Sequence, residues 1–188
     1  NVGYFQGSLD EVRIYDGALT ELQVQALYNE ESAPPAMDTY YVNDNSTTGD
    51  VFTSAVGNDA NNGTVAAPFA TIQHAVSVAP AGTAIYVDAG TYVEQVTINK
   101  GLTLTGAGRT KTLVTLPATT APVPGTFNEQ ATFQTLPDIA DVHINGFSIT
   151  GKYIEGVEAI TPVILQTGGS VRNSNLQGGN QGVFFRTE

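Results

Sequence analysis

Short apolar runs that alternate with polar residues fill the chain from residue 84 onward. They include "AIYVD", "QVTIN", "LTLTG", "TLVTL", "DVHINGFSITG" and "PVILQT", and Gly or Asn separates most of them. Alternation with a period of two, bounded by turn residues, is typical of half-buried β-strands. We therefore predict an all-β fold for this part of the chain, with no helix after Pro80.

One amphipathic helix is predicted before these strands, over about residues 71–79. Thr71 stands at the capping position, and Pro80 ends the pattern. The face with the i, i+3, i+4, i+7 spacing is narrow and made of small apolar residues: Ile72, Ala75, Val76 and Ala79. Such a helix is suited to lie flat over another layer.

An internal repeat predicts the architecture of the strands. "HINGFSITG" (143–151) and "SVRNSNLQG" (170–178) align with one gap at a spacing of 27 residues, and "TINKGLTLTG" (97–106) is interpreted as a third copy. A period of this size in a β-rich sequence predicts a solenoid. The alignment places Asn99, Asn145 and Asn173 in a hydrogen-bonded ladder, and residues 117–137 in a loop that projects from one turn of the solenoid.

Residues 1–38 follow a different pattern. Val12, Ile14 and Tyr15 predict a buried strand, and "LTELQVQALYNEE" predicts a helix with Thr20 and Gln23 in a capping arrangement. The paired prolines of "SAPPAMD" break both helix and sheet. We therefore expect a first unit at residues 1–31, a Pro-rich linker at 32–38 and a second unit at 39–188.

The composition excludes several classes of function. The formal net charge is −11, and residues 1–60 hold ten acidic side chains and one base, Arg13, so nucleic acid is not an expected partner. The chain contains no cysteine and therefore no thiolate metal site. No apolar run approaches the ~20 residues of a membrane span. Both ends are strand-like and there is no initiator Met, which predicts a piece of a larger protein.

Two stretches resemble known families. The order of "YYVN", "GNDANNGTVAAPFATIQHAV" and "GTYVEQVTINKGLTLTG" within residues 40–108 resembles the start of bacterial proteins of the pectin-lyase-like superfamily, with a DUF1565-like N-terminal cap. The resemblance implies the cap and roughly the first three turns of a right-handed parallel β-helix. "GSLDEVRIYDGALTELQVQALY" (7–28) resembles the last strand and helix of a laminin-G-like, concanavalin A-like jelly roll. Together they imply an extracellular or cell-surface bacterial protein.

Oxygen-bearing side chains gather in the polar segment 43–64, as they do around Ca2+. Asp44, Asp50, Asp59 and Asn61 are the candidate ligands, although the spacing of an EF-hand is absent. The alternative is that these Asn and Asp residues form turns. The resemblance to laminin-G-like domains adds Asp10 as a further candidate for Ca2+, whose alternative is a solvated strand edge. No other cofactor is predicted.

The sequence predicts no catalytic residue. Lys152 and Arg172 have no acidic cluster at matching positions, and His143 alternates with apolar neighbours, so we expect it to face solvent on a strand. Glycosidases require a pair of carboxylates. On this part of the chain the only candidates are residues that we expect in loops or turns: Asp138, Asp141, Glu155 and Glu158.

Three functions remain compatible with these patterns. The first is a non-catalytic structural or adhesive module that binds a polysaccharide or a cell-surface protein. The second is the front end of a polysaccharide lyase or glycoside hydrolase whose active site lies downstream. The third is a self-assembling extracellular subunit, because open strand edges can pair with another copy.

Overall fold

The computed structural model describes residues 14–32, 39–124, 129–151, 159–179 and 182–185. The chain divides into two compact units, residues 1–36 and 37–188, and the boundary falls in the predicted linker. In the first unit the described part contains helix α1 (Glu21–Ser32). Thr20 and Gln23 form the predicted capping arrangement, since the Thr20 amide donates to Gln23 Oε1 at 2.9 Å.

The strand predicted at Val12, Ile14 and Tyr15 in the first unit is wrong for the two residues that the structure describes, Ile14 and Tyr15. Ile14 and Tyr15 belong to no strand, and Ile14 is 93% exposed. A strand needs a hydrogen-bonded neighbour, and in the described part of this unit the only regular element is α1. Val12 and Asp10 lie outside the described residues.

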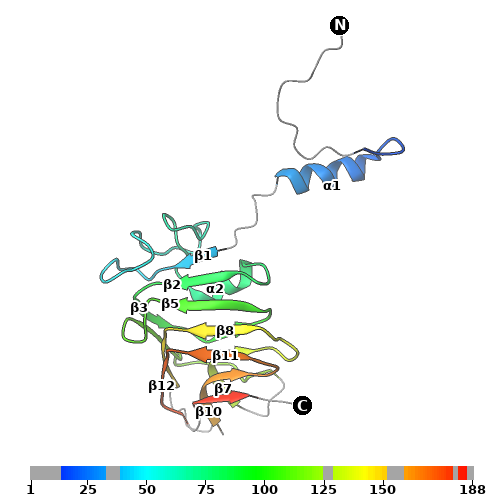
Figure 1. Ribbon diagram of the computed structural model, residues 1–188. Coiled ribbons are helices and arrows are strands. Elements are labelled where there is room, and N and C mark those ends of the chain that lie inside the picture. The colour runs from blue at the N-terminus through cyan, green and yellow to red at the C-terminus, as the bar shows by residue number, and fades with distance from the viewer. Residues whose placement is uncertain (1–13, 33–38, 125–128, 152–158, 180–181, 186–188) are drawn as a thin grey trace. The chain divides into compact units, whose positions relative to one another are not determined.

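The second unit is a parallel β-helix, as the sequence predicted (Figure 1). Strand β1 (Thr39–Val42) comes first, and the later strands follow in groups of three, each of which makes one turn that we call a rung. The first two rungs are β2 (Ala84–Val87), β3 (Gly90–Val93), β4 (Val96–Ile98), then β5 (Leu102–Gly106), β6 (Thr112–Thr115), β7 (Glu129–Thr135). The next two are β8 (Val142–Asn145), β9 (Ser148–Thr150), β10 (Ala159–Leu165), then β11 (Gly169–Arg172), β12 (Asn175–Gln177), β13 (Val183–Phe185).

Stacking of the rungs generates three parallel sheets. The first sheet has the order β1-β2-β5-β8-β11, the second β3-β6-β9-β12 and the third β4-β7-β10-β13. Residues at one register position form a column through the rungs, such as Ile85, Leu104, Ile144 and Val171. The first three of these side chains are completely buried, so the apolar columns form the core. Each such side chain contributes about 1.5–3 kcal/mol by its removal from water.

The rungs differ in length, and this corrects the predicted repeat. Ala84 pairs with Thr103, 19 residues on, whereas Leu102 pairs with Val142, 40 residues on. The predicted spacing of 27 is confirmed only between the last two rungs, where Val142 pairs with Gly169. The third copy was therefore aligned wrongly, because Leu104 and not Ile98 pairs with Ile144.

The predicted asparagine ladder exists between the last two rungs only. Asn173 Nδ2 donates to Asn145 Oδ1 at 2.8 Å. Asn99 follows β4 at a different corner of the coil and takes no part in the ladder.

The predicted projecting loop at 117–137 is also partly wrong, because residues 129–135 form strand β7. Phe133 is completely buried in this strand, and polar side chains beside it bond to neighbouring rungs. Gln134 Nε2 donates to Thr97 Oγ1 at 2.9 Å, and Thr132 Oγ1 donates to the Thr150 carbonyl at 3.0 Å. The described strands form four rungs, where roughly three were expected.

Helix α2 (Ile72–Val78) lies over the first rung, as predicted from its apolar face. The side chains of Ile72, Ala75 and Val76 are buried, and the helix packs against β1, β2 and β4. The Gln73 side chain pairs with the outer edge of β4, since its Oε1 accepts from the Thr97 amide at 2.7 Å. The helix thereby covers both the core and a strand edge.

Candidate functional site

Asp88 anchors the polar segment that precedes α2. It directly follows β2, is completely buried, and accepts the backbone amides of Val51, Phe52, Thr53 and Ala89 at 2.6–2.9 Å. The Thr53 hydroxyl donates to the same carboxylate at 3.1 Å. Burial raises the pKa of Asp88, but the four amide bonds outweigh it, and the pKa is held below its usual value. The ionised side chain therefore fixes the loop.

Asp50 and Asn43 form a polar pair beside this anchor. The Asn43 side chain is buried and donates to Asp50 Oδ2 at 2.7 Å and to the Ala55 carbonyl at 2.8 Å. Asp50 Oδ1 is buried with no hydrogen-bond partner in the described part of the chain. Burial, together with the negative charges of Asp88 and Asp44, raises the pKa of Asp50 although the Asn43 bond lowers it.

Two carboxylates satisfy the amides at the start of α2. Asp59 Oδ1 accepts from the amides of Ala70 and Thr71 at 2.8 and 3.0 Å, and its Oδ2 accepts from the Thr71 hydroxyl at 2.8 Å. Glu94 accepts from the next two amides along the chain, at 2.9 Å each. Burial raises the pKa of Glu94 despite these two bonds. Four consecutive amides without helical acceptors are thus satisfied.

The structure separates the predicted calcium ligands into two places. Asp44 and Asp50 lie near Asp88, whereas Asp59 lies at the start of α2. Asn61 Nδ2 donates to the Pro68 carbonyl at 2.8 Å, as a turn residue does. Within the described ranges, no group of three His, Cys, Asp or Glu side chains is arranged to hold a metal ion. Asp10 lies outside these ranges, and the calcium site stays a prediction.

We expect the melting temperature of the chain to be the same in chelator and in excess calcium. The reason is that both carboxylate oxygens of Asp59 already accept hydrogen bonds from the protein. A calcium ion at about 100 times its Kd would add about 2.7 kcal/mol of stability, which a thermal scan detects. A calcium-dependent rise that Asp50→Asn abolishes would instead place an ion at the unpartnered oxygen of Asp50.

Asp88 and Glu94 were missed by sequence reasoning, although the sequence carries a weak signal for the first. An acidic residue that follows a strand directly, as in "YVDAG", has its carboxylate next to the core. His143 is exposed as predicted, and its Nδ1 lies 2.9 Å from Ser170 Oγ on the next rung. Lys152, Glu155 and Glu158 lie outside the described residues.

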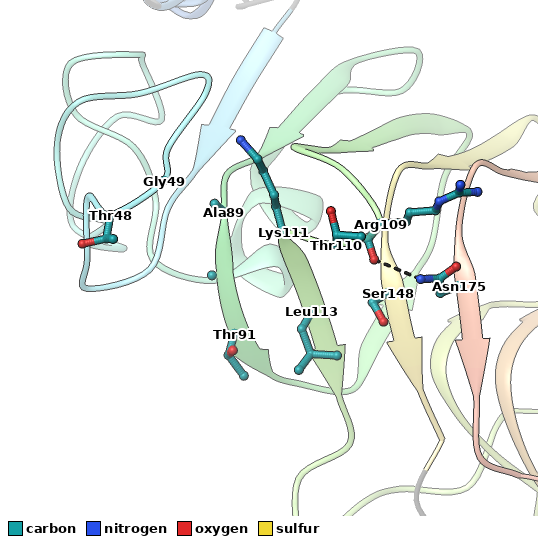
Figure 2. A pocket seen from close by; sticks show the side chains of 11 residues that line it. Thr48, Gly49, Ala89, Thr91, Arg109, Thr110, Lys111, Leu113, Ser148 and Asn175 are labelled. Atoms are coloured by element: carbon teal, nitrogen blue, oxygen red, sulfur yellow. Dashed lines mark hydrogen bonds between the residues drawn. The ribbon is translucent and has the colours of Figure 1, made fainter.

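A hollow of about 660 Å3 lies on the outer face of the second sheet (Figure 2). Its floor is a column of outward-facing residues at one register position of β3, β6, β9 and β12: Thr91, Leu113, Ser148 and Asn175. Thr48 and Gly49 of the polar segment line it as well, and so does the turn between β5 and β6. None of the residues that line the hollow carries a carboxylate.

The turn between β5 and β6 brings two cations to this hollow. Arg109 and Lys111 are exposed, and neither side chain bonds to a residue that the structure describes. Three hydrogen bonds fix the backbone of the turn. The Lys111 amide donates to the Gly108 carbonyl at 2.8 Å, within the turn. Asn175 Nδ2 donates to the Arg109 carbonyl at 3.2 Å, and the Gly90 amide donates to the Lys111 carbonyl at 3.0 Å. The hollow therefore offers positive charge and hydrogen-bond donors, and such groups can bind a ligand that carries hydrogen-bond acceptors.

Comparison with known proteins identifies one family. The profile of the family described as "Protein of unknown function (DUF1565)" matches residues 55–188, a range that begins within the polar segment and includes α2 and all four rungs. No curated protein and no solved structure matches the chain. Among the helices that the structure describes, none has the length and apolar character that crossing a membrane requires.

Proposed function

The chain belongs to the DUF1565 family, and we propose that it is a non-catalytic binding module of a larger extracellular or cell-surface bacterial protein. Its partner in this proposal is a polysaccharide or a cell-surface protein. The proposal includes kinship with the pectin-lyase-like superfamily for residues 39–188. It also includes the interpretation of residues 1–31 as the end of a laminin-G-like jelly roll, which rests on the sequence alone.

The observation that carries this proposal is a contrast: the carboxylates near α2 and β2 bond to the protein backbone, whereas the cations beside the hollow bond to no described residue. Asp59, Asp88 and Glu94 all accept backbone amides, so these carboxylates hold the fold together. Hydrolysis of a glycosidic bond requires two carboxyl groups that are free to act on the substrate. In contrast, Arg109 and Lys111 line an open hollow without a protein partner in the described ranges. Asp138 and Asp141 line a separate hollow together with His143. Binding without cleavage is therefore the function favoured by the hollow at Arg109 and Lys111 only.

We expect the full chain to retain polysaccharides without cleaving them. Affinity electrophoresis through gels that contain single polysaccharides measures retention, with the heat-denatured chain as the control. The same polysaccharides are incubated with the chain and assayed for new reducing ends and for the ultraviolet absorbance of unsaturated products. Product formation would favour the lyase or hydrolase alternative. Failure to bind any polysaccharide or any bacterial cell surface would contradict the proposal.

A second copy of the chain is the other candidate partner, because of the outermost strands. β11, β12 and β13 each stand last in their sheet, so one edge of each pairs with no described strand. Such edges are templates for strand addition. Sedimentation of the same sample separates the two cases: a mass that rises with concentration supports assembly, and a monomer at every concentration excludes it.

A further inference from the structure

We propose that the outer face of the third sheet binds an extended, uncharged, proline-containing segment of a partner protein. Residues 117–124 of the chain, which we call the strap, occupy this binding site as an internal ligand. The strap follows β6 and belongs to no helix or strand. The site lies on a different sheet from the hollow at Arg109 and Lys111, and the inference does not rest on the proposed function.

The strap buries an outward-facing apolar side chain of β10. Ile164 pairs with Gln134 of β7, one position after the pair formed by Val163 and Phe133. Val163 and Phe133 belong to the core of the coil, and because side chains alternate along a strand, Ile164 points away from that core. Ile164 is nevertheless only 1% exposed, since it packs in a separate cluster with Val123 of the strap. The strap therefore inserts one apolar side chain into a site on the surface of the sheet.

Side-chain amides of the coil bind the backbone of the strap. Gln95 bonds to both backbone groups of Ala121: its Nε2 donates to the carbonyl at 2.8 Å, and its Oε1 accepts from the amide at 2.7 Å. Gln166 Nε2 donates to the Pro124 carbonyl at 2.8 Å. These contacts recognise the main chain of a ligand, as in the addition of an extended peptide to a sheet, while the apolar contact recognises one side chain.

The same two glutamines are also held by β7, independently of the strap. Gln95 Nε2 donates to the Ala131 carbonyl at 3.2 Å, and Gln166 Nε2 donates to the Thr135 carbonyl at 2.8 Å. The backbone amide of Gln166 donates to Thr135 Oγ1 at 2.8 Å. The side chains that bind the strap are therefore ordered before any ligand arrives, which lowers the entropy cost of binding.

The sequence of the strap suits a bound peptide better than a strand. Pro122 and Pro124 have no amide hydrogen, so this segment cannot continue a ladder of backbone hydrogen bonds. Ala121 and Val123 each precede a proline, which biases their backbone toward extended conformations. Recognition of proline-containing segments exploits this prior ordering. The strap thereby defines the chemistry of the partner segment, which is an aliphatic residue between two prolines.

The site favours an uncharged segment. Gln95 and Gln166 bond to the strap, and Ile164 and Phe184 pack in the cluster that contains Val123, so all four of these side chains are uncharged. Val123 is only 1% exposed. A charged side chain at this position of a ligand would be buried against Ile164, and burial of a charge without a partner is unfavourable.

The strap competes with any free ligand because it is joined to the coil. A tethered segment acts at an effective concentration in the millimolar range. We therefore expect the wild type to bind a free segment weakly and a variant without the strap to bind it tightly. Binding to the wild type also requires that the strap opens while the coil stays folded.

The test measures binding of a fluorescein-labelled peptide with the strap sequence, PATTAPVP, to the full chain by fluorescence anisotropy. In one variant, glycines and serines in equal number replace residues 118–124, and in a second variant Val123→Ser removes the apolar anchor. We expect both variants to bind the peptide at least about tenfold more tightly than the wild type does. Circular dichroism checks that the coil is intact. An unlabelled peptide with the Val123→Asp change is expected not to compete.

Gln95→Ala together with Gln166→Ala, made in the variant without the strap, is expected to weaken peptide binding by about tenfold or more. Gln177→Ala is the matched control, because this glutamine is exposed on β12 of the second sheet, and we expect an unchanged Kd. Lack of peptide binding by both folded strap variants would overturn the inference, and so would equal competition by the Val123→Asp peptide. A wild-type dimer that dissociates when the strap is replaced would also overturn it, since the occupant would then be a second copy.

Hydrogen exchange of the wild type tests the inference without any substitution. The Ala121 amide donates to Gln95 Oε1 and the Val123 amide donates to the Glu129 carbonyl, so both amides are protected only while the strap is closed. We expect them to exchange at least about tenfold faster than the amide of Leu104 in the core of the first sheet. Exchange at the same rate as Leu104 would overturn the inference, because the site would then open only when the whole coil unfolds.

Discussion

Replacement of Asp88 by alanine is expected to destabilise the second unit by about 3–5 kcal/mol. The side chain is completely buried and accepts four backbone amides and one hydroxyl. Each buried donor that loses its partner costs about 1–3 kcal/mol, and water that enters the opened site recovers part of the sum. In a domain of this size about 1 kcal/mol shifts the melting temperature by about 2–4 °C. Thermal unfolding followed by circular dichroism should therefore show a fall of at least about 6 °C.

Asp44→Ala is the matched control for this variant. Asp44 stands in the same polar segment, but it accepts one short bond from the Ser46 amide, at 2.7 Å, and one long bond from the Thr91 amide, at 3.4 Å. We expect it to cost about 1 kcal/mol. Equal losses for the two variants would show that Asp88 does not anchor the loop.

The pH dependence of stability should change when the Asp88 side chain loses its charge. Because the folded pKa of Asp88 lies below its unfolded value, its stabilisation is present above the unfolded pKa and is lost as pH falls through the folded pKa. Asp50 and Glu94 act in the opposite direction, since their raised pKa values make their contribution largest in acid and smaller as pH rises. Asp88→Asn should therefore unfold at a melting temperature that depends less on pH below about pH 4 than that of the wild type.

Local signals explain why α2 and the β-helix could be predicted. The spacing of Ile72, Ala75 and Val76, the cap at Thr71 and the break at Pro80 are all contained within ten consecutive residues. The alternation of apolar and polar residues likewise identifies most strands individually. These features need no knowledge of distant partners.

The features that could not be predicted depend on distant contacts. Strand β7 carries buried Gln130, Thr132 and Gln134, whose polarity is typical of a loop. The bonds of Thr132 and Gln134 come from other rungs, such as that between Gln134 and Thr97, 37 residues apart. The number of residues in a rung also varies, because a long connection precedes β7. A repeat of fixed length therefore does not describe the rungs.

The hollow beside Arg109 and Lys111 was missed for a similar reason. Arg109 and Lys111 stand in a turn whose sequence is ordinary, and Asn175, which supports that turn, is 66 residues away. Asp88 anchors residues that precede it by 35 to 37 positions. Parallel stacking alone brings these residues together, and their chemistry becomes visible only once the register is known.

Placing a carboxylate on the inner face of α2, by Ile72→Asp or Val76→Asp, is expected to make the chain aggregate. Both side chains are completely buried against the first rung. A buried charge without a partner costs more than about 4 kcal/mol, so the helix is expected to detach from the core. Detachment would expose the apolar end of the coil together with the edge of β4 that Gln73 covers. Centrifugation and binding of a hydrophobic dye measure both effects.

Val78→Asp is the control on the same helix, because Val78 is 46% exposed. It introduces the same charge near the helix end, where repulsion by the helix dipole costs about 0.3–1 kcal/mol. We therefore expect this variant to remain soluble and folded. If Ile72→Asp and Val76→Asp also remain soluble with an unchanged melting temperature, α2 does not protect the end of the coil. In that case β1 alone would have to prevent pairing at this end, since it covers the outer edge of β2 in the first sheet.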